Sequence, residues 1–301
     1  MPGPWNRRGA DRAARETHIL GWLFVIPSLA AVIALILYPM VHGFQQSIRS
    51  GGFLFGEKPG YVGLRNYHDV IDDPVSREAM VHTVWYLLLA VSLELGLGIL
   101  VAATLHRVFR GRGFVLAVLI LPWALPSVVS GVLWRRVFDP DNGLLNALLL
   151  QLHIISHPHL WLASGRGAIV YITLVHVWGV LPLVSLIFLA GLQSIPDEVY
   201  SASSVDGAGP VRQFLHITLP LLRPSLAIAL TVGTLLAISI FDEIYVLNGT
   251  ALNTRSILIQ VYNTTFAQAD FAHGTALAFL LAAITALLGG LYALALRRAT
   301  V

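Results

Sequence analysis

The sequence predicts an all-α integral membrane protein with six spanning helices and both termini in the cytoplasm. Of its 301 residues, 56% are hydrophobic and only 12% are charged, which is about half the charged share of a soluble domain. The chain also contains no cysteine, so disulfides and thiolate chemistry are excluded. This composition excludes an ordinary soluble enzyme, a disordered chain and a disulfide-stabilised scaffold.

Six apolar stretches are long enough to cross a bilayer, which takes roughly 20 helical residues. They cover residues 19–41, 80–105, 114–133, 167–192, 226–247 and 274–296. The first stretch follows four arginines, as the apolar part of a signal peptide does. Its apolar run is longer than that of a cleavable signal, so we predict a retained span.

Arginine placement predicts the orientation of these spans, because cytoplasmic segments carry an excess of basic residues. The tail 1–18, the connection after span two, the loop after span four and the C-terminus are rich in arginine, whereas the opposite segments balance acidic and basic residues. We therefore predict that the former lie in the cytoplasm. Their arginines are Arg7, Arg8, Arg12, Arg15, Arg107, Arg110, Arg112, Arg212, Arg223, Arg297 and Arg298.

The outer segments between spans predict short helices and turns. The first, 42–79, predicts a loop with a short helix after Asn66. The second, 134–166, begins with a strong turn signal over 139–143 and continues as a short apolar helix over 144–152. Because no internal repeat or soluble domain interrupts the chain, we interpret residues 1–301 as a single membrane domain.

The cytoplasmic loop 194–224 has a pattern of its own. Pro196-Asp197-Glu198 is typical of a helix start, and the helix it opens is broken by glycine and proline over 206–210. A second, amphipathic helix over 211–217 is predicted to end at Leu219-Pro220. Two short helices joined by a glycine break are too short to cross the bilayer. They are suited to lie beneath it and present a face to a partner.

The spacing in this loop resembles the cytoplasmic loop of ABC-importer permeases. The pattern of that family is Glu-Ala-Ala, three residues, Gly, nine residues and Ile-x-Leu-Pro. Here Ser201-Ala202-Ser203 occupies the first triplet, Gly207 follows after three residues, and Ile217-x-Leu219-Pro220 follows after nine more. The chain departs from the pattern at Ser201, where the family has Glu, and at Ser203, where it has Ala.

Five further motifs, in the same order along the chain, resemble the carbohydrate-type subfamily, which includes maltose and glycerol-3-phosphate permeases. They are Phe24-Val25-Ile26-Pro27 with Tyr38-Pro39, Gly63-Leu64-Arg65-Asn66-Tyr67, Leu121-Pro122-Trp123 with Pro126, Asp139-Pro140-x-x-Gly143-Leu144-Leu145-Asn146, and Phe241-Asp242-x-Ile244-Tyr245-Val246-Leu247.

The resemblance implies a non-catalytic, pore-forming subunit of an ATP-driven importer in the bacterial inner membrane. Its solute would be a sugar, or a sugar-phosphate or glycerol-phosphate relative. Its partners would be a second permease, two ATPase subunits and an extracytoplasmic solute-binding protein. ATP and Mg would bind the ATPases, and the chain itself has no Gly-x4-Gly-Lys-Ser/Thr loop for a phosphate. We expect it to bind no cofactor.

The same resemblance implies that residues 196–208 form a coupling helix that docks on an ATPase subunit. The positions that match or flank the family pattern are the expected coupling residues. They are Glu198, Tyr200, Ser201, Ala202, Ser203, Asp206, Gly207, Ala208, Leu219 and Pro220.

Polar and aromatic side chains in spans four and five are candidates for the solute pathway, because a polar group inside the bilayer is costly to bury without a role. The alternative is that the hydroxyl groups join helices and the aromatic rings lie at the membrane interface. The candidates are Trp178, His176, Ser185, Ser239, Phe241, Asp242 and Tyr245.

Glu94 lies in the middle of span two and leaves two interpretations open. Either its carboxylate pairs with other groups inside the protein, or it relays protons in an ion-coupled secondary transporter that acts alone. Such transporters usually show internal repeats and more spans. For the protein as a whole, a membrane enzyme is a third possible function, but no cluster of acid, base or metal-binding residues marks the ends of the spans.

Three histidines in the second outer segment raise the question of a metal site. His153, His157 and His159 lie close together in sequence. No carboxylate accompanies them at ligand spacing, so we expect no metal there.

Overall fold

The computed structural model describes residues 24–50 and 60–299, and within them the regular structure is helical with no β-strand. The only bridge in this part of the chain is an isolated pair, Arg49 with Tyr61. The all-α prediction is therefore confirmed. The predicted tail 1–18 and the start of the first span lie outside the described residues.

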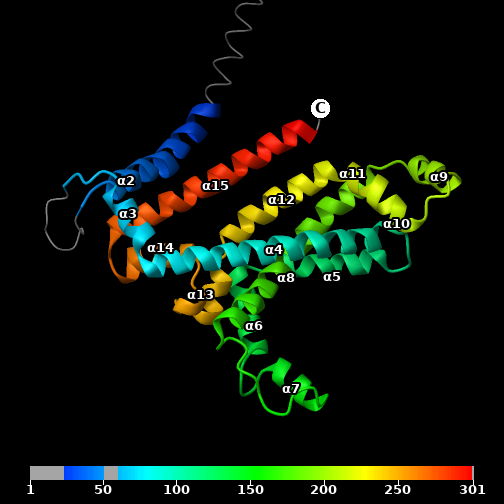
Figure 1. The fold of residues 1–301 in the computed structure, drawn as a ribbon, viewed down its shortest axis with the longest axis horizontal. Coiled ribbons are helices and arrows are strands. Elements are labelled where there is room, and N and C mark those ends of the chain that lie inside the picture. The colour runs from blue at the N-terminus through cyan, green and yellow to red at the C-terminus, as the bar shows by residue number, and fades with distance from the viewer. Residues whose placement is uncertain (1–23, 51–59, 300–301) are drawn as a thin grey trace, which may run out of the picture.

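Among the described residues, four helices are long and apolar enough to cross a membrane: Phe24–Ser47, α4 (Pro74–His106), α8 (Gly165–Gln193) and α15 (Phe271–Ala299). The first contains a π-helical turn, η1 (Ile33–Leu37), followed by α2 (Tyr38–Ser47). Two bent helix pairs, one within residues 112–137 and one within residues 210–238, bring the number of candidate spans to six if each pair counts as one span. In Figure 1, α2 lies beside α15, and α4 lies beside α8.

The α4–α8 pair forms the centre of the molecule. Residues on α4 are buried every third or fourth position, as expected for one face of a helix. On this face Gly98 is covered by Val184 and Phe188 of α8, and a Cβ at Gly98 would lie 2.7 Å from Cγ1 of Val184. Asp73 begins α4 by accepting a hydrogen bond from the Ser76 amide at 2.8 Å.

The third predicted span does not form one uninterrupted helix. Residues 114–133 fall in two helices, α5 (Arg112–Ala124) and α6 (Ser127–Val137), which meet at 100°. Pro126 causes the break, because proline lacks an amide hydrogen and its ring disfavours helical geometry in the residue before it. Leu125 accordingly has extended backbone angles.

The fifth predicted span, 226–247, does not form a single helix either. It divides into α12 (Arg223–Ile238) and α13 (Asp242–Asn248). No proline lies at this break. Instead, the Ile240 carbonyl leaves the helical pattern and accepts a hydrogen bond from the Ser256 hydroxyl at 3.3 Å.

The far halves of the two broken spans pack against each other. Gly131 of α6 lies against Val246 of α13, with room for no side chain: a Cβ there would come within 2.9 Å of the valine Cβ. Arg135 Nη1 donates to the Val246 carbonyl at 3.3 Å. Figure 1 shows α6 and α13 together beneath the α4–α8 pair.

The predicted short helices are present. They are α3 (Arg65–Asp72), α7 (Leu144–Gln151) and α9 (Asp197–Val205). The second helix of the cytoplasmic loop runs through α10 (Pro210–Gln213), η2 (Phe214–Thr218) and α11 (Leu219–Leu221), and then bends by 69° into α12. It ends at Leu221, one residue after the predicted end at Leu219-Pro220.

One helical region was not predicted. Residues between spans five and six form η3 (Leu252–Thr254), α14 (Ile257–Tyr262) and η4 (Asn263–Ala267). Ile257 and Ile259 of α14 are buried, and the Ile257 amide donates to the Thr83 hydroxyl of α4 at 2.8 Å. This region closes the end of the molecule opposite α9 (Figure 1).

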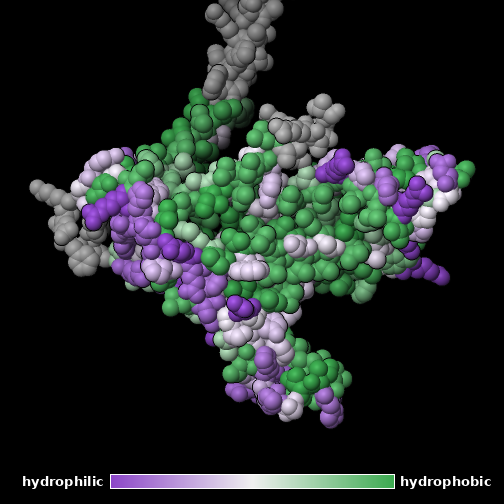
Figure 2. Space-filling view, viewed as in Figure 1, coloured by the Kyte–Doolittle hydropathy of each residue, from purple (hydrophilic) through white to green (hydrophobic). Residues whose placement is uncertain are grey.

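The surface has the polarity expected of a membrane protein. Figure 2 shows hydrophobic side chains along the middle of the molecule and hydrophilic ones mainly at the α3 and α9 ends. Large apolar side chains are exposed on several helices of the middle region. They include Leu88, Leu97, Leu100, Val118, Leu121 and Leu235.

Substitution of Gly98 tests the α4–α8 packing. We expect Gly98→Val to destabilise the purified protein by about 1–3 kcal/mol, because overpacking forces the helices apart. The matched control is Gly96→Val, since Gly96 is exposed and its Cβ would meet no atom within 4 Å. The melting temperature in detergent measures the difference. Equal melting temperatures for the two variants would contradict this close packing.

Candidate functional site

A cavity of about 280 Å³ lies where both broken spans face α8. The α5–α6 break contributes Ser127, α8 contributes His176, and the α12–α13 break contributes Ser239, Phe241 and Asp242. Four of the predicted pathway residues, His176, Ser239, Phe241 and Asp242, therefore line one cavity. Hydroxyl, carboxylate and imidazole groups converge there on a partly apolar wall.

The other three predicted pathway residues do not line this cavity. Tyr245 lies one turn beyond Phe241 and stacks on it, with ring centroids 5.6 Å apart. Trp178 packs edge-on against Trp134 of α6 at 5.6 Å. Ser185 is fully buried and donates back to the Leu181 carbonyl at 2.7 Å. It bonds within its own helix, so it neither lines the cavity nor joins two helices, although the alternative interpretation had expected span hydroxyls to join helices.

Several lining residues were missed at the sequence level. They come from the two breaks and from α8. They are Trp123, Ser127, Ser130, Gly179 and Glu243. The signal that identifies the first three is Pro126, since a proline inside an apolar span marks a point where side chains can face an opening.

Two adjacent carboxylates fix α13 beside the cavity. Asp242 accepts a hydrogen bond from the Ser127 hydroxyl of α6. Glu243 Oε1 lies 3.2 Å from His176 Nδ1 of α8, and His176 Nε2 lies 3.5 Å from Glu94 Oε1 of α4. Glu94 therefore faces His176 inside the protein and does not itself line the cavity. Four helices are joined through polar groups at this point.

The lining also has a distinct charge character. It includes the acids Asp242 and Glu243, and none of its described residues is Lys or Arg. An anionic ligand would meet no Lys or Arg side chain in this wall, and the ring nitrogens of its one histidine, His176, already face the carboxylates of Glu94 and Glu243. Hydroxyl groups of a neutral ligand would find carboxylate and serine partners, and Trp123 and Phe241 offer apolar faces.

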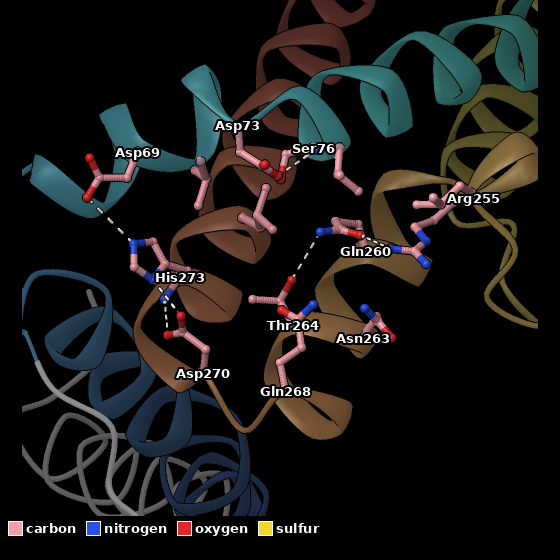
Figure 3. A pocket seen from close by; sticks show the side chains of 14 residues that line it. Asp69, Asp73, Ser76, Arg255, Gln260, Asn263, Thr264, Gln268, Asp270 and His273 are labelled. Atoms are coloured by element: carbon pink, nitrogen blue, oxygen red, sulfur yellow. Dashed lines mark hydrogen bonds and ion pairs between the residues drawn. The ribbon is translucent and has the colours of Figure 1, made fainter. Parts of the chain in front are cut away.

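A second, larger recess of about 510 Å³ lies at the end opposite α9. Figure 3 shows that its polar side chains come from α3, the start of α4, α14, η4 and the start of α15. Arg255 Nη1 donates to Gln260 Oε1 at 2.7 Å, and Gln260 Nε2 donates to the Thr264 hydroxyl at 3.3 Å. The chain therefore pairs these groups itself.

Asp69, Asp270 and His273 form the other side of this recess (Figure 3). His273 Nδ1 lies 2.7 Å from Asp270 Oδ2, and His273 Nε2 lies 3.6 Å from Asp69 Oδ2. The hydrogen bond with His273 holds the pKa of the Asp270 carboxyl below its ordinary value. This cluster connects α3 to the beginning of α15.

The predicted coupling residues lie on and around α9, at the opposite end. Tyr200 Oη lies 3.0 Å from the Thr218 hydroxyl, and Gln213 Nε2 donates to the Ser203 hydroxyl at 2.9 Å. These bonds fix α9 against the helix that follows. Gly207 has a φ of 77°, which L side chains rarely adopt.

The coupling residues divide by exposure. The half-buried ones face the second helix or belong to it: Tyr200, Ser203, Ala208, Leu219 and Pro220. The exposed ones form the free surface of the loop: Glu198, Ser201, Ala202, Asp206 and Gly207.

The three histidines of the second outer segment lie apart from both sites. His159 packs edge-on against Trp161 with centroids 4.7 Å apart, and His157 bonds to its neighbour Ser156. The described residues contain no group of three His, Asp or Glu side chains arranged to hold a metal ion.

Cysteine labelling tests which span residues face the cavity. The natural chain has no cysteine, so single replacements need no background correction. We expect Ser239→Cys to react with a small, charged thiol reagent about tenfold faster or more than Ser185→Cys, because the buried site reacts only after local opening. Mass spectrometry of the labelled protein measures both rates. Similar rates would show that Ser239 lacks access to water.

Comparison with known proteins adds to this geometry. Residues 94–301 match the family described as binding-protein-dependent transport system inner membrane component. The chain is 36% identical over 263 residues to the trehalose/maltose transport system permease protein MalF of Thermococcus litoralis, across 87% of this chain and 88% of that one. It is 30% identical over 277 residues to the trehalose transport system permease protein SugA of Mycobacterium tuberculosis, across 92% and 87%.

The fold is shared with a solved structure. A bacterial ABC transporter involved in the import of the acidic polysaccharide alginate has a chain that superposes with a TM-score of 0.82 at 19% identity, over 97% of this chain and 99% of that one. Sequence and fold therefore agree, and the chain belongs to the family of inner-membrane components of binding-protein-dependent transport systems.

Proposed function

We propose that this permease imports a neutral sugar of about disaccharide size, and that the solute passes through the cavity where the two broken spans face α8. The observation that carries this proposal is the lining, which offers serine, carboxylate and aromatic groups without Lys or Arg among its described residues. Trehalose and maltose, which the names of the relatives specify, have this chemistry. A glycerol phosphate would find no Lys or Arg partner among the described residues of this wall.

The chain forms one part of the transport machine and hydrolyses no ATP itself. The cavity of one chain is partly open, so a second permease would supply the facing wall. One of two ATPase subunits, with ATP and Mg, would dock at α9, and the other would dock on the second permease. Tyr200 and Gln213 hold α9 to the rest of the loop. This arrangement transmits movement, because a short helix fixed at several points moves with the helix behind it.

Orientation follows from the same proposal. With α9 in the cytoplasm of a bacterium, the inner membrane surrounds the apolar middle of Figure 2 and the recess of Figure 3 faces outward. A solute-binding protein would dock at that outer end, where α3 and η4 present polar side chains around the recess. The N-terminal tail and the C-terminus would then both be cytoplasmic, with six spans.

Copurification tests the assembly and the solute together. We expect the tagged chain to bring a second permease and an ATPase subunit from its native membranes, since α9 and the open cavity wall both need partners. In proteoliposomes, trehalose with the copurifying binding protein should stimulate ATP hydrolysis, and glycerol 3-phosphate should not. A chain that purifies alone and accumulates trehalose on a proton gradient would contradict the proposal.

Gly207 provides a test of coupling with a matched control. Gly207→Ala places a side chain at a φ of 77°, which costs about 1–2 kcal/mol. The strain should change the angle of α9 and lower trehalose-stimulated ATP hydrolysis while the complex still assembles. Gly209→Ala is the control, because Gly209 has a φ of −72° and open space around its Cβ position. Equal hydrolysis by both variants would remove Gly207 from the coupling mechanism.

A further inference from the structure

The carboxylate of Glu94 has an environment that the transport cavity does not explain. Its side chain is 0% exposed in the middle of α4. Neither oxygen has a hydrogen-bond partner in the part of the chain that the structure describes. A Cβ at Gly233 of α12 would lie 2.6 Å from Oε2, so α12 leaves space for the carboxylate alone. Such a group is costly to bury unless a positive charge is close.

His176 is the group that compensates Glu94. It is 5% exposed on α8, and its two ring nitrogens face two different carboxylates. Nε2 lies 3.5 Å from Glu94 Oε1, and Nδ1 lies 3.2 Å from Glu243 Oε1. Each ring nitrogen of His176 thus has one carboxylate oxygen as its nearest acidic partner. The three side chains therefore form one continuous polar link from α4 through α8 to α13.

This link ends on a unit that is separated from the rest by two breaks. The residues between α12 and α13 are not helical, and neither is the α5–α6 junction. Across these breaks, α6 and α13 are joined to each other by the Ser127–Asp242 hydrogen bond, the Arg135 bond to the Val246 carbonyl and the Gly131–Val246 contact. We call them the α6–α13 unit.

The connection between the α6–α13 unit and the α4–α8 pair is partly apolar. Ile244 and Leu247 pack into the core beside Ile172. Apolar contacts tolerate sliding, because the hydrophobic effect has no preferred direction. The polar link does not, since a shift of one or two ångströms leaves buried carboxylates without a partner. The link therefore defines one position of the unit.

We propose that Glu94, His176 and Glu243 form a latch that holds the α6–α13 unit against the α4–α8 pair, with His176 as the positioning residue, and that the transport cycle opens and re-forms it. Two discrete positions result, because intermediate ones leave a buried charge unpaired. The test of the latch by ATP hydrolysis rests on the proposed function, whereas the test by distances between helices does not depend on it.

Spin-label distances in the assembled complex test the latch directly. One label pair, Val132→Cys with Val170→Cys, reports α6 against α8. A control pair, Val84→Cys with Val170→Cys, lies within the α4–α8 pair, and all three positions are exposed in this chain. We expect His176→Gln to move or broaden the first distance distribution and leave the second unchanged, because the amide replaces the ring but cannot donate to both carboxylates.

ATP hydrolysis without solute or binding protein provides the second measurement. Releasing the latch should raise it roughly fivefold to tenfold, the change expected when a hydrogen-bonded ion pair is lost. Glu94→Gln should act in the same direction, and the double variant should equal His176→Gln, since both residues serve one link. Thr173→Val is the matched control: it removes a buried hydroxyl one turn away on α8 that bonds only to the Ile169 carbonyl.

The two measurements separate the possible failures. Unchanged α6–α8 distances in both His176→Gln and Glu94→Gln, in complexes that assemble normally, would overturn the latch. Additive effects in the double variant would also overturn it. If the unsubstituted complex fails to hydrolyse ATP or import trehalose, the proposed function fails, and the distances still decide on the latch.

Discussion

Backbone hydrogen bonding inside the bilayer determines where this chain can interrupt its helices. Each amide and carbonyl in a membrane core needs a partner within the protein, so irregular backbone is tolerated only where other helices or a cavity surround it. The two breaks that line the cavity, at Pro126 and at residues 239–241, obey that condition. They face each other across one cavity, and the carbonyl released at Ile240 is bonded by Ser256. The position of the cavity thus follows from the requirement to satisfy the backbone.

The unbroken helices α4 and α8 provide close packing, whereas the interrupted spans line the cavity. α4 and α8 pack closely because Gly98 allows Val184 and Phe188 to reach the α4 backbone. Along this pair, buried positions run from near the recess of Figure 3 to the level of α9. An unbroken, closely packed pair therefore lies beside two interrupted spans. The same division places polar side chains at the breaks, where they line the cavity, and small residues in the α4–α8 pair, where they allow close packing.

Sequence patterns predicted those elements that depend on local chemistry. The four long helices followed from the length of their apolar runs, and α9 followed from Pro196, Asp197 and the glycine break at Gly207. The interruptions near Pro126 and Ser239 were missed, because the apolar composition continues on both sides of each break. The short helix α14 was missed for a related reason: a six-residue apolar run has no clear period.

The site was predictable only in part, since its geometry depends on contacts between distant segments. His176, Ser239, Phe241 and Asp242 share a cavity as expected, but Trp178, Ser185 and Tyr245 point elsewhere because helix periodicity alone does not identify the partner on each face. The partners of Glu94 illustrate the limit. No local pattern connects a glutamate in one span to a histidine two spans later, and only the packing of α4 on α8 brings them within 3.5 Å.

The shared histidine has an evolutionary consequence. A lineage that loses His176 first would carry two unpaired acids within the membrane, and one that loses either acid first would change the charge of the whole trio. Substitution at these three positions should therefore be concerted, with a neutral or reversed set replacing Glu94, His176 and Glu243 together. The genetic route between such sets passes through poorly stable intermediates, which makes the trio a slow-changing marker among otherwise divergent permeases.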